Sequence, residues 1–185
     1  MPWSRTARLA ILWSVRRILL ALIAISAIVL AGQRACVAFA SQTTRIRLRL
    51  EEMETGFNSA ELGPCMRGIA ATWRDEEREI DRAELADGLR ALFFQEVEPQ
   101  SHAFRYRVGI DRESLAIELE PAREGHARVT LEARFELLER GAWSPTWRVR
   151  IEAEFARDAQ LGWQVTHSRP TTLASDGRLV RELRG

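Results

Sequence analysis

The stretch WRVRIEAEFARDAQLGWQVTHSRP, residues 147–170, decides the fold of this chain. Residues 147–155 alternate apolar with charged side chains, which is the period-two pattern of a strand with one buried face. The turn-forming RDAQLG interrupts the pattern, and the alternation resumes over residues 163–168. Two alternating runs around a short polar turn predict an antiparallel hairpin that is apolar on one face and polar on the other.

Three more alternating runs precede this hairpin, over residues 104–110, 115–119 and 129–137. The turn-rich segments DRES, PAREG and RGAWSP separate the runs, so the sequence predicts a curved sheet of about five antiparallel strands. We expect Phe135 to lie opposite Ile151 in the neighbouring strand, because this register also places arginines opposite glutamates on the charged face.

The region before the strands has helical periodicity. Residues 44–60 carry apolar side chains at three- and four-residue spacing, and a second, short helix is expected over residues 65–73. A third helix is expected over residues 81–95, because Asp81 and Glu84 form a capping-box pattern at its start. Three helices followed by an antiparallel sheet predict an α+β fold in which the helices cover the apolar sheet face.

The N-terminal region carries a separate hydrophobic segment. Two arginines precede a run of 15 residues, 18–32, that carries no charge and is apolar apart from Ser26. At about 1.5 Å per residue this run spans about 22 Å, which is shorter than the roughly 30 Å core of a bilayer. One interpretation is a hydrophobic helix over residues 18–40 that anchors the chain in the bacterial inner membrane, with residues 1–17 as a basic cytoplasmic N-terminus.

The alternative interpretation is a signal peptide. The tripeptide Ala38-Phe39-Ala40 resembles a cleavage site, and cleavage near Ala40 would release a secreted or periplasmic protein. In both interpretations the domain over residues 41–170 is exported. Residues 171–185 are expected to form a polar C-terminal tail.

Charge and cysteine content exclude two function classes. All 27 basic residues are arginine; residues 1–40 hold five of them and no acid, whereas residues 41–185 hold the other 22 against 26 acids. A mildly acidic domain is repelled by phosphate backbones, so we expect no nucleic-acid binding. Cys36 and Cys65 form no CxxC motif or cluster with histidine, so we expect no metal site and no cofactor.

The order of these elements resembles the nuclear-transport-factor-2-like superfamily, which also contains steroid delta-isomerase and SnoaL-type cyclases. IDRAELADGLRALFFQ, residues 80–95, is similar to the third helix of this superfamily. Residues 147–170 are similar to its last hairpin, in which Trp163-x-Val165-x-His167 resembles the closing strand of many members. The resemblance implies a cone-shaped, cystatin-like fold with a pocket between the helices and the concave sheet face.

Residues in phase with the apolar strand faces are expected to line that pocket. The candidates are Tyr106, Trp147, Trp163 and His167, with Phe93 on the third helix. As a functional pair, Tyr106 would donate a hydrogen bond to a ligand carbonyl and His167 would act as an acid or base. As structural residues, both would be core side chains with satisfied polar tips.

The sequence offers no paired catalytic chemistry. The sheet carboxylates fall on the outer phase, and the best remaining base candidates are Asp75, Glu76 and Glu77. We therefore expect a non-catalytic, membrane-anchored domain that binds a small apolar ligand or a partner protein of the cell envelope. The alternative is a small-molecule isomerase or hydratase-like enzyme with its active site inside the cone. Superfamily members often dimerise through the outer sheet face; here such a homodimer would be polar and salt-sensitive.

Overall fold

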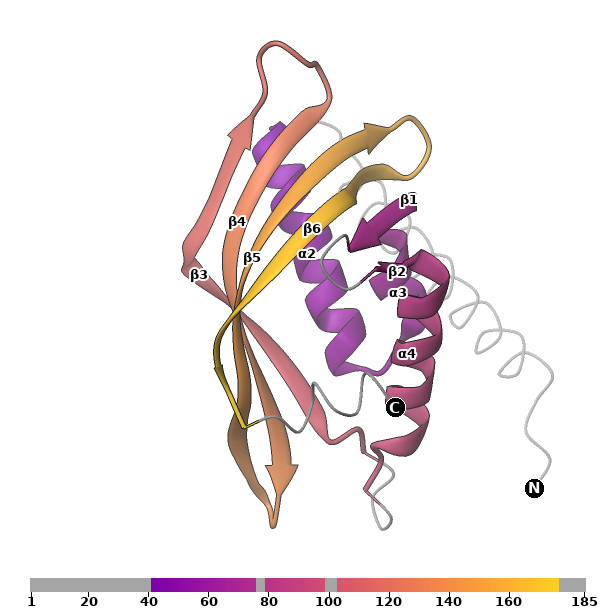
Figure 1. Ribbon diagram of the computed structural model, residues 1–185, viewed down its shortest axis with the longest axis vertical. Helices are drawn as coiled ribbons and strands as arrows, with labels where there is room; N and C mark the ends of the chain where they lie inside the picture. The colour runs from indigo at the N-terminus through magenta and orange to yellow at the C-terminus, as the bar shows by residue number, and fades with distance from the viewer. Residues whose placement is uncertain (1–40, 76–78, 99–102, 177–185) are drawn as a thin grey trace, which may run out of the picture. The chain divides into compact units, whose positions relative to one another are not determined.

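The computed structural model describes residues 41–75, 79–98 and 103–176, and it has the α+β architecture that the periodicity predicts (Figure 1). Two helices and two short strands come first, followed by a third helix and four long strands. In chain order these are α2 (Gln42–Asn58), α3 (Leu62–Arg67), β1 (Ile69–Asp75), β2 (Ile80–Asp81), α4 (Arg82–Gln95), β3 (Tyr106–Leu119), β4 (His126–Glu139), β5 (Ala142–Asp158) and β6 (Gly162–Ser175).

The strands form one curved, unclosed sheet in the order β2-β1-β6-β5-β4-β3. Strands β3 to β6 are a meander of antiparallel neighbours, whereas β1 lies parallel to β6. The long strands bend along their length, and the helices lie on one side of them (Figure 1). Because the apolar strand faces turn toward the helices, the core forms between these two layers.

The described residues from Gln42 onward form one compact unit. Its hydrophobic core extends from Ile46 on α2 to Val165 on β6 and draws on helices α2, α3 and α4 and on five of the six strands. A fragment of residues 41–185 therefore carries this whole core and can fold by itself.

The expected N-terminal anchor cannot be placed on this fold, because residues 1–17 and 18–40 lie outside the described residues. In the part of the chain that the structure describes, no helix is long and apolar enough to cross a membrane. Strand β6 continues to Ser175, so it takes in the first residues of the expected C-terminal tail.

The short second helix is present, but its expected bounds of 65–73 are wrong. Helix α3 ends at Arg67, and β1 begins at Ile69. The residue between them is Gly68, where an added Cβ would lie 2.1 Å from the Met53 sulfur. The chain therefore passes close to α2 at this glycine and leaves the helix, which places Ile69 opposite Val165 in the sheet.

The expected count of about five antiparallel strands also differs from the structure. Residues 111–114 were expected as a turn, but they form an irregularity inside the single strand β3. The Asp111 carboxylate accepts a hydrogen bond from the backbone N–H of Glu113 (3.0 Å), and Ser114 Oγ accepts one from the backbone N–H of Glu132 (2.8 Å). These side-chain oxygens accept hydrogen bonds from backbone N–H groups at the irregularity. Strand β3 therefore bulges at this point and continues beyond it.

The predicted register of β4 and β5 is wrong by four residues. Phe135 lies opposite Trp147, and Ile151 lies opposite Leu131. A shift by an even number keeps the same side chains on the apolar face, so the alternation does not distinguish the two registers. The hairpin turn and a bulge together set the register. Arg140 and Gly141 both have positive φ (51° and 80°), as a two-residue type I′ turn requires, and Thr146 is an extra residue between the pairs Glu136–Pro145 and Phe135–Trp147.

Candidate functional site

A cavity of about 290 Å³ lies between the helices and the apolar face of the sheet. We call it the inner cavity. Its walls are almost entirely aliphatic and aromatic, with Leu50 and Phe57 from α2, Leu89 from α4, Leu131 from β4 and Phe155 from β5 among the lining side chains. Such a hollow is able to take a small apolar molecule.

Three polar side chains reach the inner cavity, and the first of them is Glu54 on α2. Its Oε1 accepts a hydrogen bond from the backbone N–H of Ile110 (3.2 Å), and its Oε2 accepts one from Arg112 (2.6 Å). Each oxygen of Glu54 is therefore bound within the protein, and the Arg112 guanidinium balances its charge.

The second polar side chain is Cys65 on α3, which is a free thiol and only 6% exposed. Burial raises the pKa of the Cys65 thiol to about 11. The thiol is thus protonated at neutral pH and is a poor nucleophile. Its Sγ lies 3.7 Å from the carbonyl oxygen of Met53, within range of a weak S–H hydrogen bond.

The third polar side chain is Ser168 on β6. Its Oγ accepts a hydrogen bond from the indole N–H of Trp73 on β1, at 3.2 Å. Trp73 is 5% exposed and also lines the inner cavity. The parallel neighbours β1 and β6 therefore bring together two residues that are far apart in the sequence.

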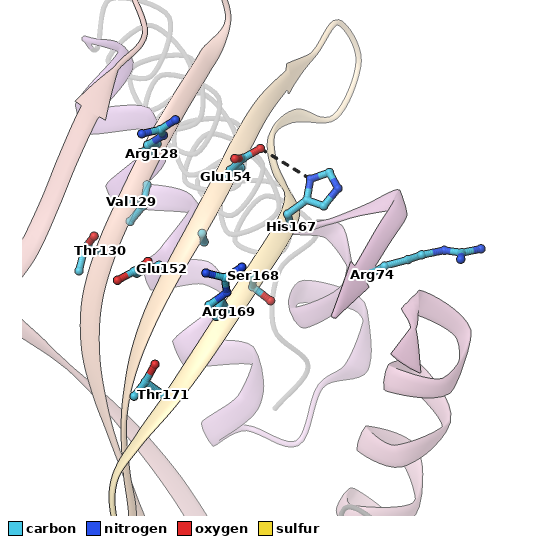
Figure 2. A pocket seen from close by; sticks show the side chains of 11 residues that line it. Arg74, Arg128, Val129, Thr130, Glu152, Glu154, His167, Ser168, Arg169 and Thr171 are labelled. Atoms are coloured by element: carbon cyan, nitrogen blue, oxygen red, sulfur yellow. Dashed lines mark ion pairs between the residues drawn. The ribbon is translucent and has the colours of Figure 1, made fainter. Parts of the chain in front are cut away.

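A second hollow of about 830 Å³ lies over strands β4, β5 and β6 and the end of β1. We call it the outer groove, and Figure 2 shows its charged lining, including Arg128, Arg169, Glu154 and His167. His167 Nδ1 lies 3.7 Å from Glu154 Oε2, and both side chains are more than half exposed. An exposed pair of this kind is well solvated and contributes little free energy.

Arginine–glutamate pairs cover the same sheet face further along. Glu132 accepts hydrogen bonds from Arg148 and Arg150, each at 2.7 Å. The hydrogen bonds from Arg150 and Arg148 lower the pKa of Glu132. The charge of Glu132 is therefore balanced by two arginines of the same chain.

Among the described residues that line the inner cavity, none of the five sequence candidates is present. Tyr106 is fully buried in the core, and Phe93 packs edge-to-face against neighbouring phenylalanines. The indole N–H of Trp147 donates to Thr172 Oγ1 (3.1 Å), and that of Trp163 donates to Gln42 Oε1 (3.2 Å). These positions favour a structural role, and a ligand contact by any of the five stays a prediction.

His167 lies on the outer face because of a bulge in β6. Val165 and His167 are opposite two consecutive residues of β5, so Thr166 is an extra residue in the ladder. The extra residue reverses the alternation that follows it. Ser168, one position further along, consequently reaches the inner cavity in place of His167.

The carboxylates proposed as base candidates do not reach the inner cavity either. Asp75 is 2% exposed at the end of β1, and it is not one of the described residues that line the cavity. Glu76 and Glu77 lie outside the described residues. The polar residues that do reach the cavity were missed, because Glu54, Cys65 and Ser168 fit no recognisable sequence motif.

No family model and no curated protein matches this sequence. Solved structures do share its fold. A protein of unknown function from Mycobacterium tuberculosis is 14% identical with a TM-score of 0.58, over 77% of this chain and 91% of that chain. A nuclear transport factor 2-like superfamily protein from Salmonella enterica serovar Typhimurium is 13% identical with a TM-score of 0.54, over 74% and 94%.

A third similar structure is a protein of unknown function with a cystatin-like fold from Nostoc punctiforme. It is 9% identical with a TM-score of 0.54, over 72% of this chain and 93% of that chain. At these identities the similarity shows the fold alone. The chain therefore has the α+β fold of nuclear transport factor 2-like and cystatin-like structures, and function has to be argued from its own residues.

Proposed function

We propose that this chain is a nuclear-transport-factor-2-like domain that binds a small, mainly apolar ligand in the inner cavity. The observation that carries the proposal is the cavity of about 290 Å³, whose apolar walls come from α2, α4 and the sheet. Ligand sites are typically concave and apolar, with a few polar groups that fix orientation. The volume corresponds to that of about ten water molecules, so the ligand is small.

An isomerase or hydratase-like activity is the weaker candidate, because such chemistry needs an acid and a base in contact with the substrate. His167 and Glu154 lie together in the outer groove, where water surrounds both. Of the titratable residues described at the inner cavity, Glu54 is bound to Arg112 and Cys65 is protonated. A binding role therefore accounts for the inner cavity better than catalysis does.

Replacing Ala133 with leucine is expected to weaken binding of the apolar fluorophore N-phenyl-1-naphthylamine by residues 41–185 at least tenfold. Ala133 is buried on β4 and lines the inner cavity, so the larger side chain fills the space that the probe would occupy. Fluorescence titration measures the affinity, and circular dichroism checks the fold, since overpacking costs about 1–3 kcal/mol.

Ala116→Leu is the matched control, because Ala116 is exposed on β3 in the same sheet. It should leave the affinity for the probe unchanged. Equal affinities of the Ala133→Leu and Ala116→Leu variants would show that the probe binds elsewhere on the surface.

We further propose that the domain is exported and held at the membrane by residues 18–40. Two arginines before the apolar run, and acids confined to residues 41–185, support this orientation. N-terminal sequencing of the mature protein from a bacterial membrane fraction is expected to find the uncleaved N-terminus. A mature chain that starts at Ser41 would contradict the anchor and leave a released domain.

In the cell envelope the domain would present its charged outer face to other proteins. A homodimer through this face is part of the proposal, since the arginine–glutamate pairs there lie on a surface that alternates both signs of charge. Salt would weaken such a dimer, because exposed charges are screened over about 8–10 Å at physiological ionic strength.

A further inference from the structure

The hydrogen bond between Trp73 and Ser168 leaves one donor at the inner cavity without a partner among the residues that the structure describes. A serine hydroxyl carries one proton and two lone pairs. The Trp73 indole N–H takes up one lone pair of Ser168 Oγ. Among the described residues, no hydrogen bond uses the proton of Ser168, so this proton is free to be donated.

The surroundings make that free donor significant. Ser168 is half-buried, and both Ser168 and Ala153, which lies opposite it in β5, line the inner cavity and the outer groove. The hydrogen bond with the buried Trp73 places the Ser168 Oγ on the inner side of the sheet, where its neighbours are apolar. A donor that faces apolar groups loses the hydrogen bonds that water would give it. A ligand atom that accepts a hydrogen bond would restore one of them.

The other polar groups of the cavity restrict the ligand further. Both oxygens of Glu54 are already hydrogen-bonded, and the Cys65 thiol is directed at a backbone carbonyl. No arginine or histidine is among the described residues that line the inner cavity. An anionic ligand would thus be buried without a counter-ion, which is costly. The Glu54 carboxylate is already paired with Arg112, so a cationic ligand would have to compete for it.

We propose that Ser168, positioned by Trp73, is the polar anchor of the inner cavity, and that it selects neutral apolar ligands with one hydrogen-bond-accepting oxygen, such as a carbonyl or an ether. The inference rests on the proposed function, because it concerns the same cavity. It adds a ligand class to that function. It also assigns a specificity-determining role to Ser168, which the sequence alternation had placed on the outer face of the sheet.

Two compounds of the same shape test the anchor. In 2-acetylnaphthalene a C=O group stands where 2-isopropenylnaphthalene has C=CH₂, so only the first accepts a hydrogen bond. The affinities of residues 41–185 for both are measured by displacement of N-phenyl-1-naphthylamine. Ser168→Ala is expected to weaken binding of the ketone about three- to tenfold, which is the loss of one hydrogen bond, and to change binding of the alkene less than about twofold.

The comparison between the two compounds separates the hydrogen bond from the general hydrophobicity of each ligand, and the alkene affinity reports whether the variant cavity is intact. Thr171→Ala is the control, since Thr171 belongs to β6 and lines the outer groove, as Ser168 does, but it is exposed and is not among the described residues that line the inner cavity. It should change neither affinity.

Each remaining outcome overturns a defined part of the reasoning. If Ser168→Ala changes both affinities equally, or neither, the cavity binds apolar molecules but Ser168 is not its anchor. If the unmodified domain binds neither compound nor the fluorophore, the proposed function falls and the anchor falls with it.

Discussion

Replacing Phe57 with alanine is expected to lower the free energy of unfolding of residues 41–185 by about 3–5 kcal/mol, the usual range for a buried phenylalanine. Phe57 is 8% exposed. Its ring contacts those of Phe93, Phe104 and Phe135 edge-to-face, with centroid distances of 5.7, 5.5 and 5.6 Å. Each contact adds about 0.5–1.5 kcal/mol to the free energy of burial.

The position of Phe57 favours the upper part of that range. Its ring also forms part of the wall of the inner cavity. Truncation therefore enlarges an existing hollow, and a larger residual cavity costs more free energy than one that neighbouring side chains fill.

Phe94→Ala is the matched control for this variant. Phe94 follows Phe93 on α4 but is 83% exposed, so its removal should change the free energy of unfolding by less than about 0.5 kcal/mol. Urea unfolding followed by circular dichroism measures both variants. Similar losses in the two, or a loss below about 1 kcal/mol for Phe57→Ala, would show that the aromatic cluster does not stabilise the fold as described.

Sequence patterns predicted correctly those features that depend on residues within a single helix or strand. Asp81 caps α4 as predicted: its side chain accepts from the backbone N–H groups of Ala83 and Glu84, and Glu84 completes the capping box. The apolar phase of β4 is also confirmed, since Val129 and Leu131 are buried. Capping and alternation depend on residues within a few positions of each other, so the sequence contains them directly.

The same patterns failed where structure depends on how two strands meet. The bulge at Thr166 exchanges His167 for Ser168 at the inner cavity, and nothing in an alternating sequence marks an inserted residue. Trp73 joins the candidate site only because β1 pairs with β6 across the sheet. The hydrogen bond from Trp73 to Ser168 therefore could not be predicted from either segment alone.

Cys65 is expected to react with iodoacetamide about a hundredfold more slowly at pH 8 in folded residues 41–185 than in the same fragment unfolded in guanidinium chloride. The thiolate is the reactive form. Burial raises the pKa of the Cys65 thiol from 9.0 to about 11, so the thiolate fraction at pH 8 falls by about two orders of magnitude. Cys36 precedes the fragment, which leaves Cys65 as its single cysteine.

The raised pKa of Cys65 also predicts how stability and labelling rate change with pH. The folded state binds the thiol proton more tightly than the unfolded state, so the stability that this thiol contributes is complete below pH 9 and is lost as pH rises toward 11. The labelling rate of the folded fragment should consequently still rise about tenfold per unit between pH 8 and pH 9.5, whereas the rate of the unfolded fragment levels off near pH 9.

An exposed cysteine in the same sheet distinguishes burial from a general property of the fragment. The double variant Cys65→Ala with Ala116→Cys places the thiol at an exposed position on β3, where it should react as fast as the unfolded control. Cys65 lines the inner cavity, so N-phenyl-1-naphthylamine bound there should slow its labelling further. If folded Cys65 instead reacts within a few-fold of the unfolded rate at pH 8, water reaches its sulfur freely, and the inner cavity is not the shielded apolar site that the proposed function requires.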